Sequence, residues 1–316
     1  MTVRETVLVT GGTGFLGRRL GIALRDSFQV VLAARNNKQN QMAAERTGCR
    51  VLPMDVSNIE SVRDVFTETR PSLVIHAAAT KFVDLAEQLP MECIDVNVVG
   101  SQNVARVAVE KGVRGVIGIS TDKASPPVRN TYGLSKALME RMFASMNGKT
   151  ATKFACVRYG NVAWSTGSVL PIWKKMHDEN GVIRSTGPEM RRFFFTVDEA
   201  VTLVRIAIEQ LDTIQGRVLA RPMKAAQIQD LLKVWVEKKG GRWERMNGRP
   251  GERLDEYLVG DLELPYAREV TYDGARHIVI SFNEKSDSPL PAVISSANAE
   301  RLTHDEMVRL INHPED

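Results

Sequence analysis

The stretch Thr6-Val-Leu-Val-Thr10-Gly11-Gly-Thr-Gly14-Phe-Leu-Gly17 decides the fold of this chain. Its first five residues are typical of a β-strand, and a helical pattern of apolar residues begins at Leu16. Gly11 suits a tight turn, Gly14 lets a pyrophosphate approach the backbone, and Gly17 lets the helix pack closely on the strand. Because the helix N-terminus also offers free amides, the motif predicts a dinucleotide-binding unit. A plain strand–turn–helix without a ligand is the alternative.

The second expected strand, Gln29–Ala34, decides which dinucleotide we expect. It ends in Arg35-Asn-Asn-Lys38, where an NAD-binding fold usually carries an acidic residue for the ribose hydroxyls. Arg35 and Lys38 suit a 2′-phosphate instead, so NADP is expected rather than NAD. The alternative is that Arg35 stacks on the adenine or faces solvent.

Two further strands are expected to end beside the cofactor. The run Cys49–Val56 contains Asp55, which can accept a hydrogen bond from the adenine amino group or can cap the next helix, with Ser57 as a rival cap. The run Leu73–Ala79 ends in small residues that let a flat cofactor approach. Asn97 lies in a helical pattern and is expected to bond to backbone across the core.

Strands alternate with helices over residues 6–119, which predicts an α/β fold with a doubly wound parallel sheet of the Rossmann type. The alternation then gives way to irregular, Arg-rich sequence. We therefore expect a cofactor-binding domain over 1–160, with a returning segment at about 193–220. Residues 161–316 are expected to form mainly a smaller C-terminal substrate-binding domain. Thr196 begins a capping-box pattern for the returning helix.

Composition excludes several classes of protein. The 316 residues are 43% hydrophobic and 25% charged, and 42 Lys and Arg against 38 Asp and Glu give a net charge of +4. This mild excess does not require a nucleic acid and suits a small phosphorylated ligand. The three cysteines form no CxxC pair, so we expect no disulfide, no metal site and a reducing cytoplasm. No signal peptide and no membrane span are expected.

A second decisive stretch, Ile119–Lys136, follows a buried strand and concentrates groups that transfer protons. Thr121, Asp122 and Lys123 come where that strand ends. Tyr132 and Lys136 are four residues apart and share one face if the segment is helical. A hydroxyl, a carboxyl, two amines and a phenol would then converge. A polar loop that leads into a helix is the structural alternative.

Together these features resemble the extended short-chain dehydrogenase/reductase superfamily, and within it the CapD-like polysaccharide biosynthesis group of inverting UDP-N-acetylglucosamine 4,6-dehydratases. The resemblance spans nearly the whole chain. The motifs that carry it are Gly11–Gly17, His76–Ala79 with Lys81, Ser120–Ala124, Tyr132–Lys136, Arg158–Val162, Ser165–Val169, Arg192-Phe193 with Thr196 and Glu199–Val201, Arg249–Arg253 and Ser295–Thr303. The chain departs from the group at Phe82 and Asp255, where the group commonly has His.

Tyr132 and Thr121 have the chemical groups needed to oxidise a sugar hydroxyl. A Tyr132 phenolate can take the proton of a sugar hydroxyl while hydride leaves to nicotinamide, and Thr121 can hydrogen-bond the same hydroxyl. A free Tyr titrates near pH ~10, and the Lys136 ammonium and the cationic nicotinamide would lower that value.

Elimination of water from a 4-keto sugar needs a base at carbon 5 and an acid at the carbon 6 hydroxyl. Asp122 and Lys123 are adjacent and can supply them. The resemblance implies that Lys123 takes the carbon 5 proton and that Asp122 protonates the leaving hydroxyl. It further implies that hydride returns to carbon 6 and that carbon 5 inverts. Alternatively, Lys123 is a phosphate contact.

The expected contacts fall into two sets, one for the cofactor and one for the substrate. The expected cofactor contacts are Gly11, Thr13, Gly14, Phe15, Leu16, Gly17, Arg35, Asp55, Val56, Ala77, Ala78, Ala79, Asn97, Tyr132 and Lys136. The expected contacts with a UDP-sugar substrate are Lys81, Asn161, Ser168, Arg192, Arg249 and Glu252. Arg suits a diphosphate and Glu suits ribose hydroxyls, although each charge can equally be structural.

Three functions compete on this sequence. The first is an NADP-dependent nucleotide-sugar 4,6-dehydratase that supplies glycan or surface-polysaccharide synthesis. The second is a nucleotide-sugar 4-epimerase or reductase, which would not need the Asp122–Lys123 pair. The third is a redox-sensing NADP-binding regulator, a class that typically lacks the catalytic Tyr or Lys. By resemblance to the superfamily, a homo-oligomer is expected.

Overall fold

The computed structural model describes residues 4–248 and 250–312. Its main feature is a nine-stranded sheet in the order β14-β15-β10-β6-β5-β4-β1-β2-β3. The six strands from β3 to β6 run parallel, in the order typical of a doubly wound dinucleotide-binding fold. These strands are β1 (Thr6–Thr10), β2 (Gln29–Ala34), β3 (Arg50–Pro53), β4 (Leu73–His76), β5 (Gly115–Ile119) and β6 (Lys153–Arg158). The predicted fold class is therefore confirmed.

The far edge of this sheet comes from the second half of the chain. β10 (Val218–Ala220) pairs parallel with β6, and the antiparallel hairpin of β14 (Ala267–Tyr272) and β15 (Ala275–Ile280) extends the sheet. We expected the chain to return to this sheet only at about residues 193–220. The structure shows that the hairpin also joins the sheet, which its sequence alone does not indicate.

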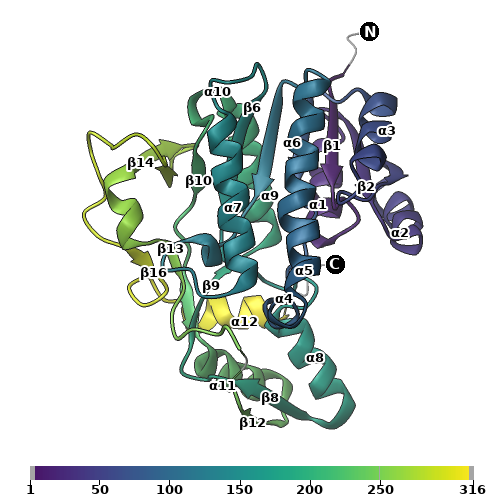
Figure 1. Cartoon of the computed structure of the whole chain (residues 1–316). Coiled ribbons are helices and arrows are strands. Elements are labelled where there is room, and N and C mark those ends of the chain that lie inside the picture. Colours follow the sequence, from purple (N-terminus) through teal and green to yellow (C-terminus); the bar gives the residue numbers. More distant parts are fainter. Residues whose placement is uncertain (1–3, 249, 313–316) are drawn as a thin grey trace.

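Helices cover both faces of the sheet (Figure 1). α6 and α7 lie in front of the sheet in this view with α3 beside α6, while α9 lies behind it and packs on α1. The helices of these layers are α1 (Phe15–Leu24), α2 (Asn37–Thr47), α3 (Ile59–Thr69), α6 (Gly100–Glu110), α7 (Thr131–Met146), α9 (Val197–Glu209) and α10 (Leu211–Ile214). The segment before α6 contains α4 (Val83–Gln88), α5 (Pro90–Ile94) and the π-helical turn η1 (Asp95–Val99).

Two predicted helix starts have different outcomes. α9 has the expected capping box, in which the Thr196 hydroxyl accepts from the backbone N–H of Glu199 and the Glu199 carboxylate accepts from that of Thr196. At α3 the N-cap is Asn58, whose side chain accepts from two backbone amides. Both Asp55 and Ser57 were therefore wrong as caps, because Asn58 directly precedes the first helical residue, Ile59.

The second lobe lies below the sheet in Figure 1. It contains two two-stranded sheets and one three-stranded sheet, with β7, β9 and β11 in the latter. Its helices are α8 (Val169–Asn180), α11 (Ile228–Lys239) and α12 (His304–Asn312). Its strands are β7 (Asn161–Val162), β8 (Val182–Thr186), β9 (Arg191–Phe195), β11 (Ala225–Gln227), β12 (Arg242–Met246), β13 (Tyr257–Val259) and β16 (Ile294–Ser295). Over the described residues, no helix combines the length and the apolar character needed to cross a membrane.

Candidate active site

The glycine loop forms a cradle that only glycine permits. Gly11 has a φ of 65°, and a Cβ added to it would lie 2.7 Å from the Cα of Ala78. A Cβ on Gly17 would lie 2.5 Å from the Cα of Gly12, so α1 rests directly on the turn. Gly14 is the N-cap of α1 and has no side chain to block the helix amides. This arrangement fits the pyrophosphate of a dinucleotide.

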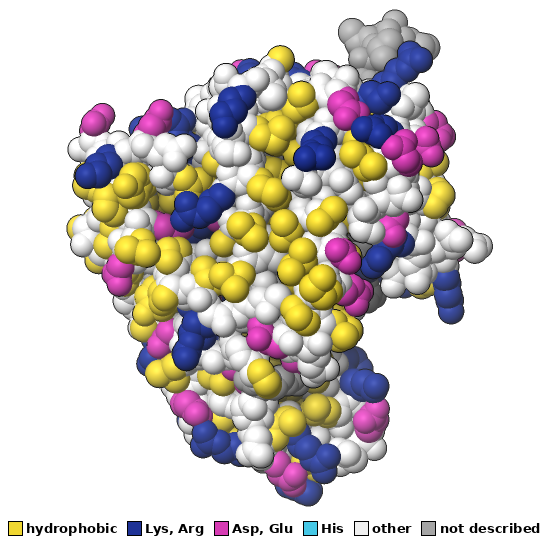
Figure 2. Space-filling view, viewed as in Figure 1, with side chains coloured by type: hydrophobic (Ala, Val, Ile, Leu, Met, Phe, Trp, Pro, Cys, Tyr) yellow, Lys and Arg dark blue, Asp and Glu magenta, His cyan; other side chains and the backbone are white. Residues whose placement is uncertain are grey.

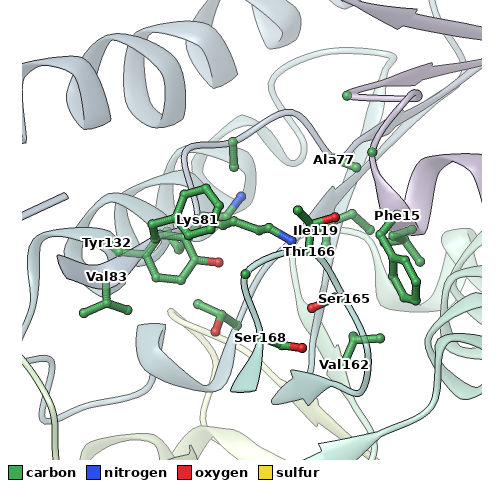
Figure 3. Close-up of a pocket in the computed structure, with 18 of the residues that line it drawn as sticks. Phe15, Ala77, Lys81, Val83, Ile119, Tyr132, Val162, Ser165, Thr166 and Ser168 are labelled. Atoms are coloured by element: carbon green, nitrogen blue, oxygen red, sulfur yellow. The ribbon is translucent and has the colours of Figure 1, made fainter. Parts of the chain in front are cut away.

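One cavity of about 810 Å³ runs from this cradle to the second lobe. Figure 3 shows Phe15 and Ala77 at one side of it, with Tyr132, Ser165 and Ser168 around its other side. The predicted residues that line the cavity are Gly11, Thr13, Gly14, Phe15, Leu16, Gly17, Arg35, Val56, Ala77, Ala78, Ala79, Lys81, Thr121, Lys123, Tyr132, Lys136, Asn161, Ser168, Arg192 and Glu252. Arg249 lies outside the described residues.

Two predicted cofactor contacts, Asp55 and Asn97, are not among the residues that line the cavity. Asp55 accepts hydrogen bonds from the backbone N–H and the hydroxyl of Ser57, at 2.9 Å and 2.7 Å, and so holds the turn after β3. Asn97 is fully buried and bonds in both directions with the backbone of Thr80, at 2.8 Å and 2.9 Å. Its predicted bonding to backbone is confirmed, and it supports the loop that lines the cavity.

Tyr132 and Lys136 reach the cavity from the first turns of α7. Asn130 caps this helix by accepting from the backbone N–H of Gly133 at 2.7 Å. Burial and then the charge of Asp122 raise the pKa of Tyr132 above its usual value, although a hydrogen bond with Thr121 opposes them. Burial lowers the pKa of Lys136 to about 8. In the protein alone, the pKa of Tyr132 thus moves opposite to the direction expected from Lys136.

Asp122 and Lys123 form a close pair in the 3-10 turn η2 (Asp122–Ala124), directly after β5. The Oδ1 atom of Asp122 accepts from Lys123 Nζ and from the Thr121 hydroxyl, each at 3.0 Å. Asp122 is fully buried, and its Oδ2 atom has no hydrogen-bond partner among the described residues. Burial, and secondarily the charge of Glu256, raise the pKa of Asp122 while Lys123 opposes them. Asp122 is therefore suited to carry a proton.

Sequence reasoning missed the carboxylate that completes this group. Glu256 lines the cavity, and its Oε1 atom lies 3.8 Å from Lys123 Nζ. Its Oε2 atom accepts from Nη2 and Nε of Arg253, at 2.7 Å and 3.1 Å. Glu256 follows Asp255 in the motif region, but only the fold brings it to η2. No local pattern in the sequence marks it.

Side chains of the second lobe divide between the cavity and its frame. The Arg192 guanidinium donates to the carbonyls of Arg253 and Leu254, at 2.7 Å and 3.2 Å, which fixes it in the cavity wall. Glu252 accepts from the Thr186 hydroxyl at 2.9 Å. Asp255 makes two bonds of 2.6 Å to Arg191 and does not line the cavity.

The other departure from the group, Phe82, lies directly in the cavity wall. A Cβ on Gly167 would come within 2.0 Å of the Phe82 ring, so the ring rests on the backbone of the Ser165–Ser168 loop. The Phe82 ring therefore connects the two lobes, at a position where the CapD-like group commonly has His.

A second cluster of buried charges lies near the ends of β5 and β6. Arg158 is fully buried and bonds to both carboxylate oxygens of Glu140 and of Glu263, at distances from 2.6 Å to 3.0 Å. The Ser120 hydroxyl donates to Glu140 at 2.5 Å. This cluster ties β5, β6, α7 and the 3-10 turn η3 (Asp261–Tyr266) together and so fixes the start of η2.

Comparisons with known proteins identify the family. The model of the family described as polysaccharide biosynthesis protein matches residues 7–273. An inverting UDP-N-acetylglucosamine 4,6-dehydratase of Campylobacter jejuni is 33% identical over 281 residues, which cover 85% of this chain and 82% of that protein. A UDP-glucose 4-epimerase of Rickettsia bellii is 34% identical over 284 residues, with the same coverage of 85% and 82%. The crystal structure of Pen from Bacillus thuringiensis is 28% identical, has a TM-score of 0.89 and covers 99% of this chain and 98% of that chain.

Proposed function

The chain belongs to the polysaccharide biosynthesis protein family, and we propose that it is an NADP-dependent 4,6-dehydratase of UDP-N-acetylglucosamine that inverts carbon 5. The Asp122–Lys123 pair, 3.0 Å apart, carries this proposal: Lys123 lines the cavity together with Tyr132, and Asp122 is buried beside Lys123. Oxidation at carbon 4 needs one base, whereas elimination needs a further acid and a further base. The site holds groups for both tasks.

Tyr132 acts on the carbon 4 hydroxyl. The phenol is half-buried at the cavity wall and interacts with the Thr121 hydroxyl, so a sugar hydroxyl placed beside both would be oriented by both. A dinucleotide whose pyrophosphate is bound in the glycine cradle would supply a hydride acceptor for carbon 4 and a hydride donor for carbon 6. Because burial and Asp122 raise the pKa of Tyr132, the positive charges of Lys136 and of the oxidised cofactor are needed to form the phenolate.

Asp122 and Lys123 carry out the elimination. The raised pKa of the Asp122 carboxyl favours the protonated form that donates to the leaving hydroxyl at carbon 6. The Lys123 amine, freed of a proton, takes the hydrogen at carbon 5, which the neighbouring ketone makes acidic. After the step the carboxylate and the ammonium are paired at 3.0 Å, so the separated charges stabilise one another.

The residues that line the cavity support the proposed substrate contacts. Lys81, Asn161 and Ser168 face the region next to Tyr132, where the sugar would lie. Arg192 and Glu252 line the part formed by the second lobe, where we place the UDP moiety. Arg35 lines the opposite end and supports NADP, since a guanidinium binds a 2′-phosphate well.

Sequence similarity to 4-epimerases favours one alternative function on the same scaffold. NMR of purified protein with UDP-N-acetylglucosamine in deuterated water separates the two. A dehydratase gives a methyl signal from carbon 6, which receives the returned hydride, and deuterium at carbon 5, together with a 4-keto product. A 4-epimer without any methyl signal would refute the dehydratase.

We also propose that the protein is a homo-oligomer of a reducing compartment. Apolar side chains gather over the middle of the face shown in Figure 2, where α5 and α7 lie, and Met91 and Leu138 are 69% and 51% exposed there. All three cysteines are free, which suits a reducing compartment. Light scattering should give a mass above 35.1 kDa, and Leu138→Glu should reduce it. A monomeric wild-type protein would contradict the oligomer.

A further inference from the structure

Glu256 is a buried ionisable group in the cavity for which the reaction described above assigns no task. Its side chain is 4% exposed, and it approaches the acid–base pair from the second lobe. Its Oε1 atom lies 3.8 Å from Lys123 Nζ, while Lys123 Nζ lies 3.0 Å from Asp122. Three ionisable groups, two acidic and one basic, thus form a chain with Lys123 in the middle.

The backbone around Glu256 fixes it in this place. Its N–H donates to the Ser296 hydroxyl at 3.0 Å, and its carbonyl accepts from the backbone N–H of Ser296 at 2.8 Å. Its carboxylate accepts two bonds from Arg253, whose Nη1 atom donates in turn to the carbonyl of Pro127 at 2.6 Å. Because both the backbone and the carboxylate of Glu256 are held by hydrogen bonds, its negative charge is preorganised and not that of a mobile surface group.

The charged groups that face Glu256 set its ionisation. They come from η2 (Asp122 and Lys123), from β9 (Arg192, with Nε 3.9 Å from Oε1) and from its own loop (Arg253). Burial alone would raise the pKa of Glu256, but the charges of Lys123, Arg192 and Arg253 outweigh burial and lower that pKa. Glu256 is therefore a carboxylate at neutral pH, and it adds to the rise in the pKa of Asp122.

Elimination requires one proton on the Asp122–Lys123 pair. With a second proton on the pair, Lys123 is an ammonium and cannot act as the base. With no proton on the pair, Asp122 is a carboxylate and cannot act as the acid. We propose that Glu256 is a positioning residue whose fixed negative charge keeps this single proton on the Asp122–Lys123 pair at the working pH. Its charge acts on both members at short range, so both macroscopic titrations of the pair lie at higher pH than they would without it.

The first test reads the pair without any turnover. The cofactor-loaded protein is treated with a trace of an amine-acylating reagent across a pH series, and mass spectrometry measures how much of Lys123 is labelled. Glu256→Gln should move the midpoint of the Lys123 labelling curve to lower pH by about one unit or more. Glu256→Asp, which keeps the charge but withdraws it from Lys123, should give an intermediate midpoint and serves if the Gln variant does not fold.

The matched control is Asp255→Asn. It removes a negative charge from the adjacent residue, which pairs with Arg191 outside the cavity. Its Lys123 labelling curve should coincide with that of the wild-type protein. Equal midpoints for wild type and the folded Glu256 variants would overturn the proposal, whatever reaction the enzyme catalyses.

The second test rests on the proposed function. Both limbs of the kcat/KM profile for dehydration should shift to lower pH in Glu256→Gln, while thermal stability is recorded separately. A lower rate with unshifted limbs would show a merely structural role and would overturn the proposal. Absence of a dehydration product from the wild-type enzyme refutes the proposed function alone, because the labelling test still decides the role of Glu256.

Discussion

Two clusters of buried charges flank the ends of β5 and β6, and they differ in how completely they are bonded. In the first, the structural cluster of Ser120, Glu140, Arg158 and Glu263, all five N–H donors of Arg158 are engaged, the fifth by the carbonyl of Leu258 at 2.9 Å. In the second, the proposed catalytic cluster of Asp122 and Lys123 with the supporting residues Arg253 and Glu256, the Asp122 Oδ2 atom has no partner among the described residues.

The difference shows how to distinguish a framework from a reacting site. A fully bonded network has no donor or acceptor left for a substrate, so its contribution is rigidity. A buried carboxyl with an open oxygen, beside an amine that lines a cavity, has an unfilled bond to offer. The structural cluster also holds Ser120, the residue before Thr121, so it fixes the place where the catalytic cluster begins.

The largest expected effect comes from removing the reacting amine. Lys123→Ala should lower the rate of dehydration by about 10²–10⁴-fold, because the base at carbon 5 is lost. Its free energy of unfolding should fall less than that of a variant in the structural cluster, since Lys123 lines the cavity and the raised pKa of Asp122 lets this carboxyl take a proton once the amine is gone. Single-turnover NMR measures the product, and denaturant unfolding measures stability. Full dehydration by this variant would remove Lys123 from the mechanism and leave only a phosphate-contact role.

The structural cluster should respond in the opposite way. Arg158→Met leaves Glu140 and Glu263 buried without a cation, which is expected to destabilise the fold by about 3–5 kcal/mol. Urea unfolding measures this loss. A triple variant that also carries Glu140→Gln and Glu263→Gln should recover much of the stability, because no unpaired charge remains. An Arg158→Met protein as stable as wild type would mean that the two clusters do not differ as described.

The contrast also explains which features the sequence could predict. The glycine loop, the strands β1 to β5 and the capping box at Thr196 are local, since periodicity and a few fixed spacings define each of them. Tyr132 and Lys136 share a helix turn, and Asp122 and Lys123 are neighbours, so both pairs were predictable as pairs.

Features that depend on distant segments could not be predicted. Glu256 reaches Lys123, and Glu263 reaches Arg158, only because the C-terminal half folds back onto β5 and β6. The β14–β15 hairpin joins the main sheet for the same reason. Asp55 was predicted as a cofactor contact or a cap, and the cap alternative was wrong: Asp55 bonds to Ser57, because such short polar turns offer several partners at similar cost.

The smallest expected effect concerns a third charge pair, which is neither buried nor tightly bonded. Arg35 and Asp55 approach to 3.9 Å with side chains 54% and 37% exposed, so their mutual attraction contributes little to stability. The guanidinium of Arg35 therefore loses little stabilisation when it leaves Asp55 and binds a 2′-phosphate, with which it can form charge-assisted bonds.

Arg35→Ala should weaken NADP binding by about tenfold, or about 1.4 kcal/mol, and leave NAD binding almost unchanged. Calorimetric titration of the stripped protein with each dinucleotide measures both affinities. If the two affinities fall equally, Arg35 contacts the adenine and cofactor choice lies elsewhere. If only NADP binding falls, an exposed and loosely paired charge selects the cofactor, whereas the buried clusters fix the frame and transfer the proton.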